Sequence, residues 1–150
     1  MNDAPPKKAT LRQVVPFLAV SDMSRSRAFY LEKLAFESKN EWVVDGEIRW
    51  CWLTRDGISL MLQHFTAGPN ALPNDVPRGV GVSLNVICDD AVAVYDEAIA
   101  RGLEASEPEV GNGMWYTIVR DPDGYKLDFE SPTDVPEDTK LSEIRPLRAV

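Results

Sequence analysis

The feature that most constrains this chain is an internal repeat. A shift of 67 residues brings similar residues together at turn signals and on strand faces, where local physical chemistry restricts the residue type. The matching pairs include Asp22 with Asp89, Asp56-Gly57 with Asp123-Gly124, and Leu62 with Phe129. The sequence therefore predicts two copies of one supersecondary unit.

Each copy is expected to contain a strand, a helix and three further strands. The patterns that support this are apolar, β-branched runs, helical spacing of apolar residues after a capping residue, and Asp-Gly turns. In the first copy we expect strands at 13–20, 38–44, 47–54 and 57–65, with a helix capped by Ser21 or Asp22. In the second copy we expect strands at 79–87, 103–108, 114–120 and 125–131, with a helix capped by Asp89 or Asp90.

A chain of 150 residues fits one domain with its own core. We expect a flexible N-terminus at 1–12 and one domain at 13–131, built from units 13–65 and 79–131. The segment 66–78 is rich in proline and glycine and has no periodicity, which predicts a linker. The charged tail at 132–150 is expected to form a surface strap or a disordered end, with a short helix near 138–144.

Composition excludes several classes of partner. The formal charge of -8 disfavours nucleic acid and anionic membranes, because phosphate binding needs a basic surface. The same charge is compatible with a cationic ligand, and a role in solubility explains it equally well. No apolar run approaches the roughly 20 residues that cross a bilayer, and the start resembles no secretory signal, so we expect a cytoplasmic protein.

Three stretches resemble one known family. They are PFLAVSDMSRSRAFYLEKLAF at 16–36, DDAVAVYDEAIARGLE at 89–104 and GMWYTIVRDPDGYKLDF at 113–129. In this order they are similar to the glyoxalase, bleomycin-resistance and extradiol-dioxygenase group, the vicinal oxygen chelate superfamily. Pro16 in the first strand resembles the start of the metal-free bleomycin-resistance branch. The resemblance implies an α+β fold of tandem βαβββ units, which form a half-open, cup-shaped mixed sheet with helices outside, and it implies a homodimer.

The resemblance also implies four metal-ligand positions, on the first and last strand of each unit. On the last strand of the second unit this position is Asp128, which could bind a metal. The equivalent residue of the first unit is Met61, followed on that face by Gln63, and neither anchors a hard ion. Positions 14–17 and 81–84 offer no strong ligand, and the single histidine, His64, is expected on the opposite face from Met61 and Gln63. We therefore expect no metal and no other cofactor.

Strand alternation predicts which side chains line the cup. The expected ligand-binding residues are Arg49, Met61, Gln63, Ser83, Asn85, Tyr116, Ile118 and Asp128. By the same repeat, Cys51 is expected to point inward, and Trp50 and Trp52 are expected in the helix-packed core. Alanine in Leu34-Ala35-Phe36 stands where the family has glycine, and we expect a negative φ there.

These residues favour a small-molecule binding protein, with the ligand cationic or amphipathic, as in antibiotic sequestration. One alternative is a metal-independent isomerase or lyase, in which Asp128 moves a proton while Arg49 or Tyr116 stabilises an oxyanion. A second alternative is a divalent-metal glyoxalase or dioxygenase. A third is a degenerate unit that survives as a structural or interaction module. The sequence does not name the ligand and does not decide whether a reaction occurs.

Overall fold

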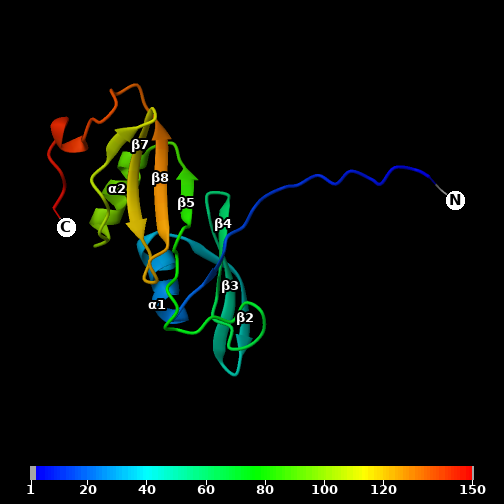
Figure 1. The fold of residues 1–150 in the computed structure, drawn as a ribbon. Coiled ribbons are helices and arrows are strands. Elements are labelled where there is room, and N and C mark those ends of the chain that lie inside the picture. Colours follow the sequence, from blue (N-terminus) through cyan, green and yellow to red (C-terminus); the bar gives the residue numbers. More distant parts are fainter. Residues whose placement is uncertain (1–2, 150) are drawn as a thin grey trace.

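The computed structural model describes residues 3–149 and contains two mixed four-stranded sheets (Figure 1). The first sheet has the order β1-β4-β3-β2, and the second has the order β5-β8-β7-β6. In each sheet the first strand of the unit runs parallel to the last one, and the other pairs are antiparallel. The predicted α+β fold of two βαβββ units is confirmed.

The elements of the first unit are β1 (Phe17–Ala19), α1 (Met23–Ala28), η1 (Phe29–Lys33), β2 (Glu37–Val44), β3 (Glu47–Arg55) and β4 (Ile58–Gln63). Those of the second unit are β5 (Ser83–Ile87), α2 (Ala91–Ala100), β6 (Glu109–Gly111), β7 (Met114–Arg120) and β8 (Lys126–Pro132). A short 3-10 turn, η2 (Leu141–Glu143), follows in the tail. The prediction of a strand at 103–108 was wrong, because β6 begins only at Glu109, where it pairs with Tyr116. No helix in residues 3–149 is long and apolar enough to cross a membrane.

Asp22 and Asp90 begin the two helices as N-caps. Each side-chain carboxylate accepts a hydrogen bond from a backbone N–H in the first turn, at 2.9 Å in both cases. The first helix passes into a π-helical turn, η1, whereas α2 runs on without one. A π-helical turn accommodates an extra residue, so the helices keep equivalent positions in the two units although their lengths differ.

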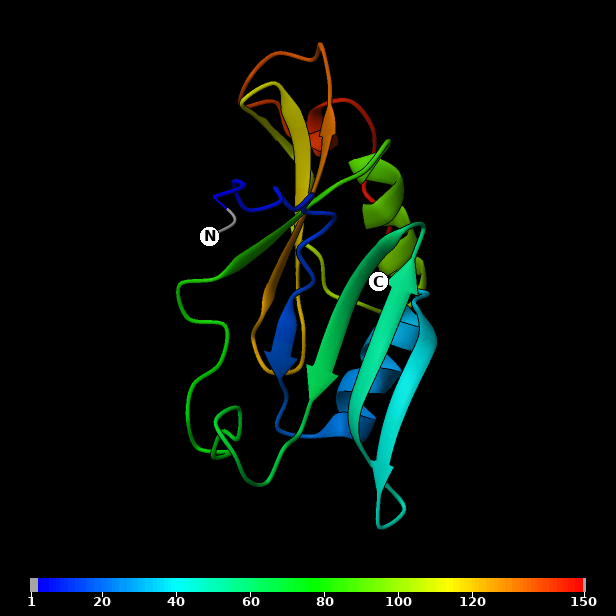
Figure 2. The ribbon, with the colours of Figure 1, turned by 90° about the vertical axis from the view of Figure 1, so that its right-hand side faces the viewer.

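One hydrophobic core joins the covered faces of both sheets. It includes Leu18, Leu53, Leu60 and Leu62 from the first sheet, and Val119, Leu127 and Phe129 from the second. Tyr30 lies at its centre with no exposed surface. Figure 1 shows α2 behind the second sheet, and Figure 2 shows α1 behind the first, so each sheet keeps its other face open.

The turn Asp121-Pro122-Asp123-Gly124 connects the two units. Asp121 is buried and accepts hydrogen bonds from Tyr30 Oη at 2.9 Å and from the backbone N–H of Tyr125 at 2.8 Å. Asp123 accepts from the backbone N–H of Ser21 at 3.1 Å, and from the hydroxyls of Ser21 at 2.5 Å and Ser26 at 3.4 Å. A turn of the second unit thus binds the start of the first helix.

The linker 66–78 has no regular structure, but the side chain of Arg78 holds it. Arg78 is buried and donates to the backbone carbonyls of Leu72, Pro73, Asn74 and Val76, and to that of Ala19 on β1. The adjacent Gly79 has a φ of +71°, and a Cβ atom there would lie 2.8 Å from the Gly124 carbonyl oxygen. Only glycine fits this approach without displacing the turn.

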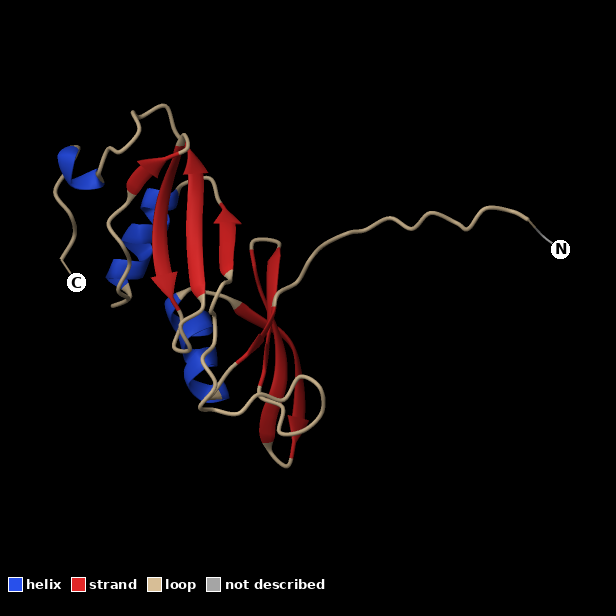
Figure 3. Cartoon of the chain, in the orientation of Figure 1, coloured by secondary structure: helices blue, strands red, loops and turns tan. Residues whose placement is uncertain are grey.

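The tail forms an ordered strap beside α2 and β6 (Figure 3). The backbone N–H of Val110 donates to Thr139, and that of Asp138 donates to Val110, so the tail covers the free edge of β6. Leu141 completes a second cluster with Tyr95, Ile99 and Trp115. A covered edge cannot pair with a strand of another chain, so this edge of the second sheet is protected.

The expectation of a negative φ at Ala35 was wrong, because its φ is +54°. This residue follows the helix and reverses the chain into β2. The left-handed conformation costs an alanine more than a glycine because of its Cβ atom. The family's glycine therefore has a conformational reason, and this chain tolerates some strain at the position.

We expect Asp123→Ala to destabilise the fold by about 1–3 kcal/mol, because three donors of the first unit lose their acceptor. Urea unfolding measures this change. Asp134→Ala is a matched control, since Asp134 is exposed and lies outside the contact between the units. Equal stability of the two variants would contradict a role for the turn in joining the units.

Ala35→Gly should stabilise the protein by about 0.5–1 kcal/mol, because glycine adopts the positive φ without strain. Thermal and urea unfolding give the difference. The control is Ala100→Gly, at the end of α2, where the residue is helical and glycine should destabilise. A loss of stability in Ala35→Gly would refute the assignment of strain.

Candidate functional site

The open face of the second sheet carries the predicted carboxylate. Asp128 on β8 pairs with Asn85 on β5 and with Ile118 on β7, and Tyr116 pairs with Glu130. Since neighbours in register point to the same side of a sheet, these residues share one face. The alternation predicted for Ser83, Asn85, Tyr116, Ile118 and Asp128 is therefore confirmed, while their contact with a ligand remains a prediction.

Asp128 has an unsatisfied acceptor. Its residue is only 8% exposed, and its Oδ1 atom is buried without a hydrogen-bond partner. The other oxygen, Oδ2, lies 3.4 Å from Lys126 Nζ. Burial raises the pKa of this carboxyl, Lys126 lowers it in part, and Glu130 raises it further. A buried acceptor without a donor favours a ligand that brings an N–H or O–H group.

The polar neighbours of Asp128 are more exposed and bond to one another. Asn85 Nδ2 donates to Glu130 Oε1 at 2.6 Å, and the Ser83 hydroxyl donates to Asn85 Oδ1 at 2.8 Å. Burial raises the pKa of Tyr116, so its hydroxyl stays protonated at neutral pH. This face thus presents one free buried acceptor, surrounded by groups that mostly have partners.

On the first sheet, the prediction of which β3 side chains face the cup was wrong for Trp50, Cys51 and Trp52. Trp50 pairs with Gln63 and Trp52 with Met61, so both indoles share the open face with these residues. Cys51 pairs with Leu62 and is fully buried in the core, where its Sγ lies 4.0 Å from Met23 Sδ. The two tryptophans are therefore not core residues, and Cys51 does not line the cup.

The physical reason is the length of the β3–β4 turn. Arg55 pairs with Ile58 across two turn residues, Asp56 and Gly57. In the matching turn between β7 and β8, the Asp121 N–H donates to the Tyr125 carbonyl across three residues, 122–124, so this turn is one residue longer. The single repeat shift of 67 residues therefore cannot align both strands of one hairpin with both strands of the other. Because side chains alternate, an error of one residue moves each of them to the opposite face.

The open face of the first sheet is an aromatic surface. It contains Phe17, Trp42, Trp50 and Trp52, with Phe65 just beyond β4. The Phe65 ring packs edge-to-face against Phe17 and Trp42, with centroids 5.8 and 5.9 Å apart. Phe17 is 43% exposed and Trp42 is 54% exposed, so a ligand or partner can reach the rings. We call these five residues the aromatic face.

Gln63 lies on this side but is not free to contact a ligand. It is 4% exposed, its Nε2 donates to the Asn70 carbonyl at 2.6 Å, and its Oε1 accepts from the Phe65 backbone N–H at 2.8 Å. Its amide therefore holds the start of the linker against the sheet.

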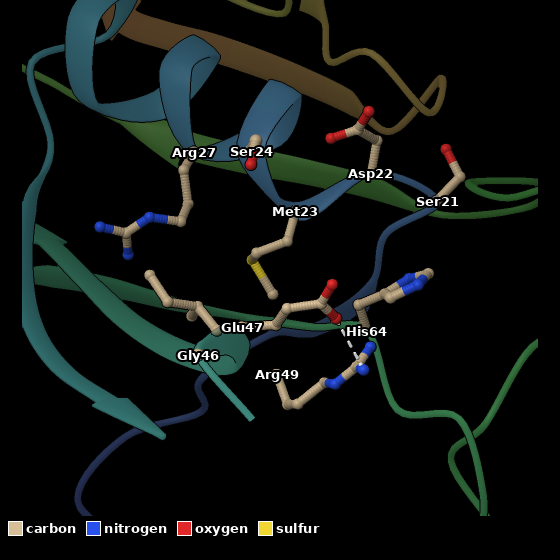
Figure 4. A pocket seen from close by; sticks show the side chains of 10 residues that line it. Ser21, Asp22, Met23, Ser24, Arg27, Gly46, Glu47, Arg49 and His64 are labelled. Carbon is tan, nitrogen blue, oxygen red and sulfur yellow. Dashed lines mark ion pairs between the residues drawn. The ribbon is translucent and has the colours of Figure 1, made fainter. Parts of the chain in front are cut away.

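Arg49 lies near the beginning of β3, an inner strand of the first sheet, and lines two cavities. One, of about 420 Å³, lies between the start of α1 and β3 and also contains Glu47 and His64 (Figure 4). The other, of about 460 Å³, is lined by Trp42, Phe65 and the start of the linker. Arg49 forms an ion pair with Glu47 at 2.7 Å. Arg49 was predicted to line the cup together with Met61 and Gln63. The His64 backbone N–H donates to the Arg49 carbonyl at 2.9 Å, so Arg49 opposes His64 and borders the aromatic face only through the second cavity.

His64 faces away from Met61 and Gln63, as the alternation predicted. Its Nδ1 lies 2.8 Å from the carbonyl oxygen of Val20. A carbonyl only accepts, so Nδ1 carries the proton and Nε2 is the acceptor in the neutral ring. This bond holds the end of β4 near the end of β1, which is a structural role.

The metal site that the family implies does not fit these residues. Asp128 faces Asn85, and Met61 faces Phe17, at the adjacent positions of the first strands. An amide, a thioether and a phenyl ring do not complete a site for a hard divalent ion. Across residues 3–149, no three His, Cys, Asp or Glu side chains are grouped in a way that could hold a metal ion.

Comparison with solved structures shows the same fold. TnmS3, an antibiotic binding protein from Streptomyces sp. CB03234, is 22% identical, with a TM-score of 0.63 over 83% of this chain and 100% of its own. TioX from Micromonospora sp. ML1 is 20% identical, with a TM-score of 0.65 over 81% of this chain and 98% of its own. A bleomycin-binding protein complexed with bleomycin is 23% identical, with a TM-score of 0.64 over 81% of this chain and 98% of its own.

No curated protein matches the sequence. The family model described as Glyoxalase/Bleomycin resistance protein/Dioxygenase superfamily matches residues 10–129, which span both βαβββ units as far as Phe129 on β8 and exclude the tail. With the duplicated fold, the closing hairpin and this match, the chain belongs to the glyoxalase, bleomycin resistance protein and dioxygenase superfamily.

Proposed function

We propose that this protein binds a small organic molecule on the open faces of its sheets, without a metal and without chemical conversion. The observation that carries the proposal is the free acceptor of Asp128 on one face, combined with the exposed rings of the other. Apolar walls with a few unsatisfied polar groups are typical of ligand sites.

The chemistry of the two faces describes the ligand. The aromatic face favours a flat, apolar group, because rings stack on indole and phenyl surfaces and lose their contact with water. The buried Asp128 oxygen favours a donor, and a cationic donor gains most from a carboxylate. An amphipathic molecule with a ring system and an amine meets both demands. Sequestration of an antibiotic is consistent with such a ligand, and the names of structurally similar proteins support it.

We further propose a homodimer. Apolar side chains remain exposed on or beside the open faces, among them Phe17, Trp42 and Ile87. The segment before β1 extends away from the body in Figure 1, with Leu11 94% and Val14 93% exposed. Exposed apolar surfaces of this kind are typical of interfaces, and a second copy would cover them. Light scattering of the purified chain should give twice the mass of one chain.

An enzyme that uses Asp128 is the second candidate. The raised pKa of this carboxyl is the observation that favours it, since a poised acid or base is a common feature of proton-transfer sites. Against it, Arg49, one of the two groups expected to stabilise an oxyanion, lies on the other sheet, on β3. Turnover lost in Asp128→Asn would establish this candidate in place of simple binding.

A thermal-shift screen across antibiotics and aromatic metabolites tests the proposal. A ligand that binds only the native state raises the melting temperature. For an amine-bearing ligand we expect Asp128→Asn to weaken binding about tenfold or more, by loss of a charge-assisted hydrogen bond, and Trp52→Ala to weaken it as well. Glu104→Gln is the control, because Glu104 is an exposed carboxylate in the segment after α2.

Two outcomes would contradict the binding proposal. One is a ligand whose affinity is the same in the wild type, Asp128→Asn and Trp52→Ala, because it would bind elsewhere. The other is stoichiometric zinc, manganese or iron in elemental analysis, retained on dialysis and lost in Asp128→Ala.

The pH dependence of stability gives an independent check on Asp128. Burial raises its pKa in the folded state, so folding favours the protonated form. Its contribution to stability therefore falls as the pH rises from its ordinary pKa, about 3.9, through the higher folded value. Asp128→Asn lacks this penalty, so its stability relative to the wild type should increase between about pH 4 and pH 7 in urea unfolding. A relative decrease over this range would show that the carboxylate is stabilised rather than strained.

A further inference from the structure

Two irregularities in the β2–β3 ladder each involve a basic residue. Pairing passes from Ser38 with Leu53 directly to Asn40 with Trp52, so Lys39 is left out of the register. It also passes from Trp42 with Trp50 to Val43 with Ile48, so Arg49 is left out. A β-bulge turns the extra side chain away from the regular alternation, and bulges are frequent beside functional sites.

The first bulge brings a cation to the aromatic face. Lys39 is exposed, and its ammonium lies 5.2 Å from the centroid of the Trp52 ring. This cation–π contact occupies one side of the indole. A positively charged ligand group at this point would be repelled by Lys39, whereas a negatively charged group would be attracted.

The second bulge places Arg49 at the border of the aromatic face, beside Trp42 and Phe65. Its side chain lines the cavity of about 460 Å³ with Trp42, Phe65 and Asp45. Glu47 binds one guanidinium nitrogen, but this glutamate side chain is 67% exposed. Arginine carries five N–H donors, so a single exposed carboxylate leaves donors available for another acceptor.

Trp52 itself offers a third donor. Its Nε1 atom is buried and lacks a hydrogen-bond partner, and it is the only such donor among the buried side chains of residues 3–149. The aromatic face therefore combines ring surfaces with an unsatisfied N–H and two cations, in a chain whose formal charge is -8. The polarity is opposite to that of the Asp128 face, where the free group is an acceptor.

We propose that the aromatic face recognises an acidic group, such as a carboxylate or sulfonate, attached to an aromatic ring, through Lys39 and Arg49. This inference rests on the proposed binding function and extends it. The proposed function assigns one charged group to the ligand, an amine that contacts Asp128, and this inference adds an acidic group. A ligand that uses both sheets then carries an acid and an amine on one ring system, so it is amphoteric rather than simply cationic.

Two probes that share one ring system and differ in charge, 1-naphthylacetate and 2-(1-naphthyl)ethanol, test this inference. Their affinities are measured by calorimetry or ligand-observed NMR at low salt. The wild type should bind the acid about fivefold more tightly than the alcohol, as expected for a partly exposed ion pair. The double variant Lys39→Met and Arg49→Gln should lose this preference while its affinity for the alcohol changes less than about twofold. Added salt should reduce the preference in the wild type.

Lys8→Met is the matched control, because it removes one exposed positive charge from the N-terminal segment, away from both sheets. The inference is wrong if the double variant keeps the preference, if Lys8→Met abolishes it equally, or if the wild type binds the alcohol as well as the acid or binds neither probe. The proposed function is judged separately, since a ligand that depends on Asp128 and Trp52 but not on Lys39 or Arg49 would support it while overturning this inference.

Discussion

The contact between the Asp121–Gly124 turn and the first helix sets the geometry of the whole molecule. Two βαβββ units joined by an irregular linker could adopt many relative positions. Here Asp123 accepts from Ser21 and Ser26, and Asp121 accepts from the buried hydroxyl of Tyr30. These bonds lie beside the shared core, where an unpaired carboxylate or hydroxyl would be costly. The turn therefore determines how the two units pack, and with it where the open faces lie.

The two open faces differ in chemistry although they derive from equivalent strands. The first sheet presents rings with Lys39 and Arg49 at its bulges, and the second presents a buried carboxylate with hydrogen-bonded neighbours. Duplication thus provided a frame in which the two faces carry different chemical groups. The residues at the family's metal positions make chelation the least consistent of the functions considered, because Met61, Phe17 and Asn85 are poor ligands for hard ions.

Much of the fold could be predicted from local patterns. Asp-Gly turns, apolar strands and capping aspartates located most strands and both helices, and the alternation on β7 and β8 placed Tyr116, Ile118 and Asp128 on one face. The error for Trp50, Trp52 and Cys51 came from extending one repeat shift across two hairpins whose turns differ by a residue. A comparison of turn lengths, Asp56-Gly57 between Arg55 and Ile58 against Pro122 to Gly124 between Asp121 and Tyr125, could have revealed it. The bulges at Lys39 and Arg49 had no clear sequence signal, since neither glycine nor proline marks them.

The sequence by itself determined the duplicated unit, the strand and helix content, and the absence of strong ligands at the family's metal positions, because these depend on residue type and local periodicity. Only the tertiary structure decided that three tryptophans line an open face, that Gln63 holds the linker, and that one oxygen of Asp128 lacks a donor. These properties depend on register, turn length and contacts between distant segments. A shift of one residue reverses the facing of a whole strand, and no local pattern reports which side the rest of the chain will cover.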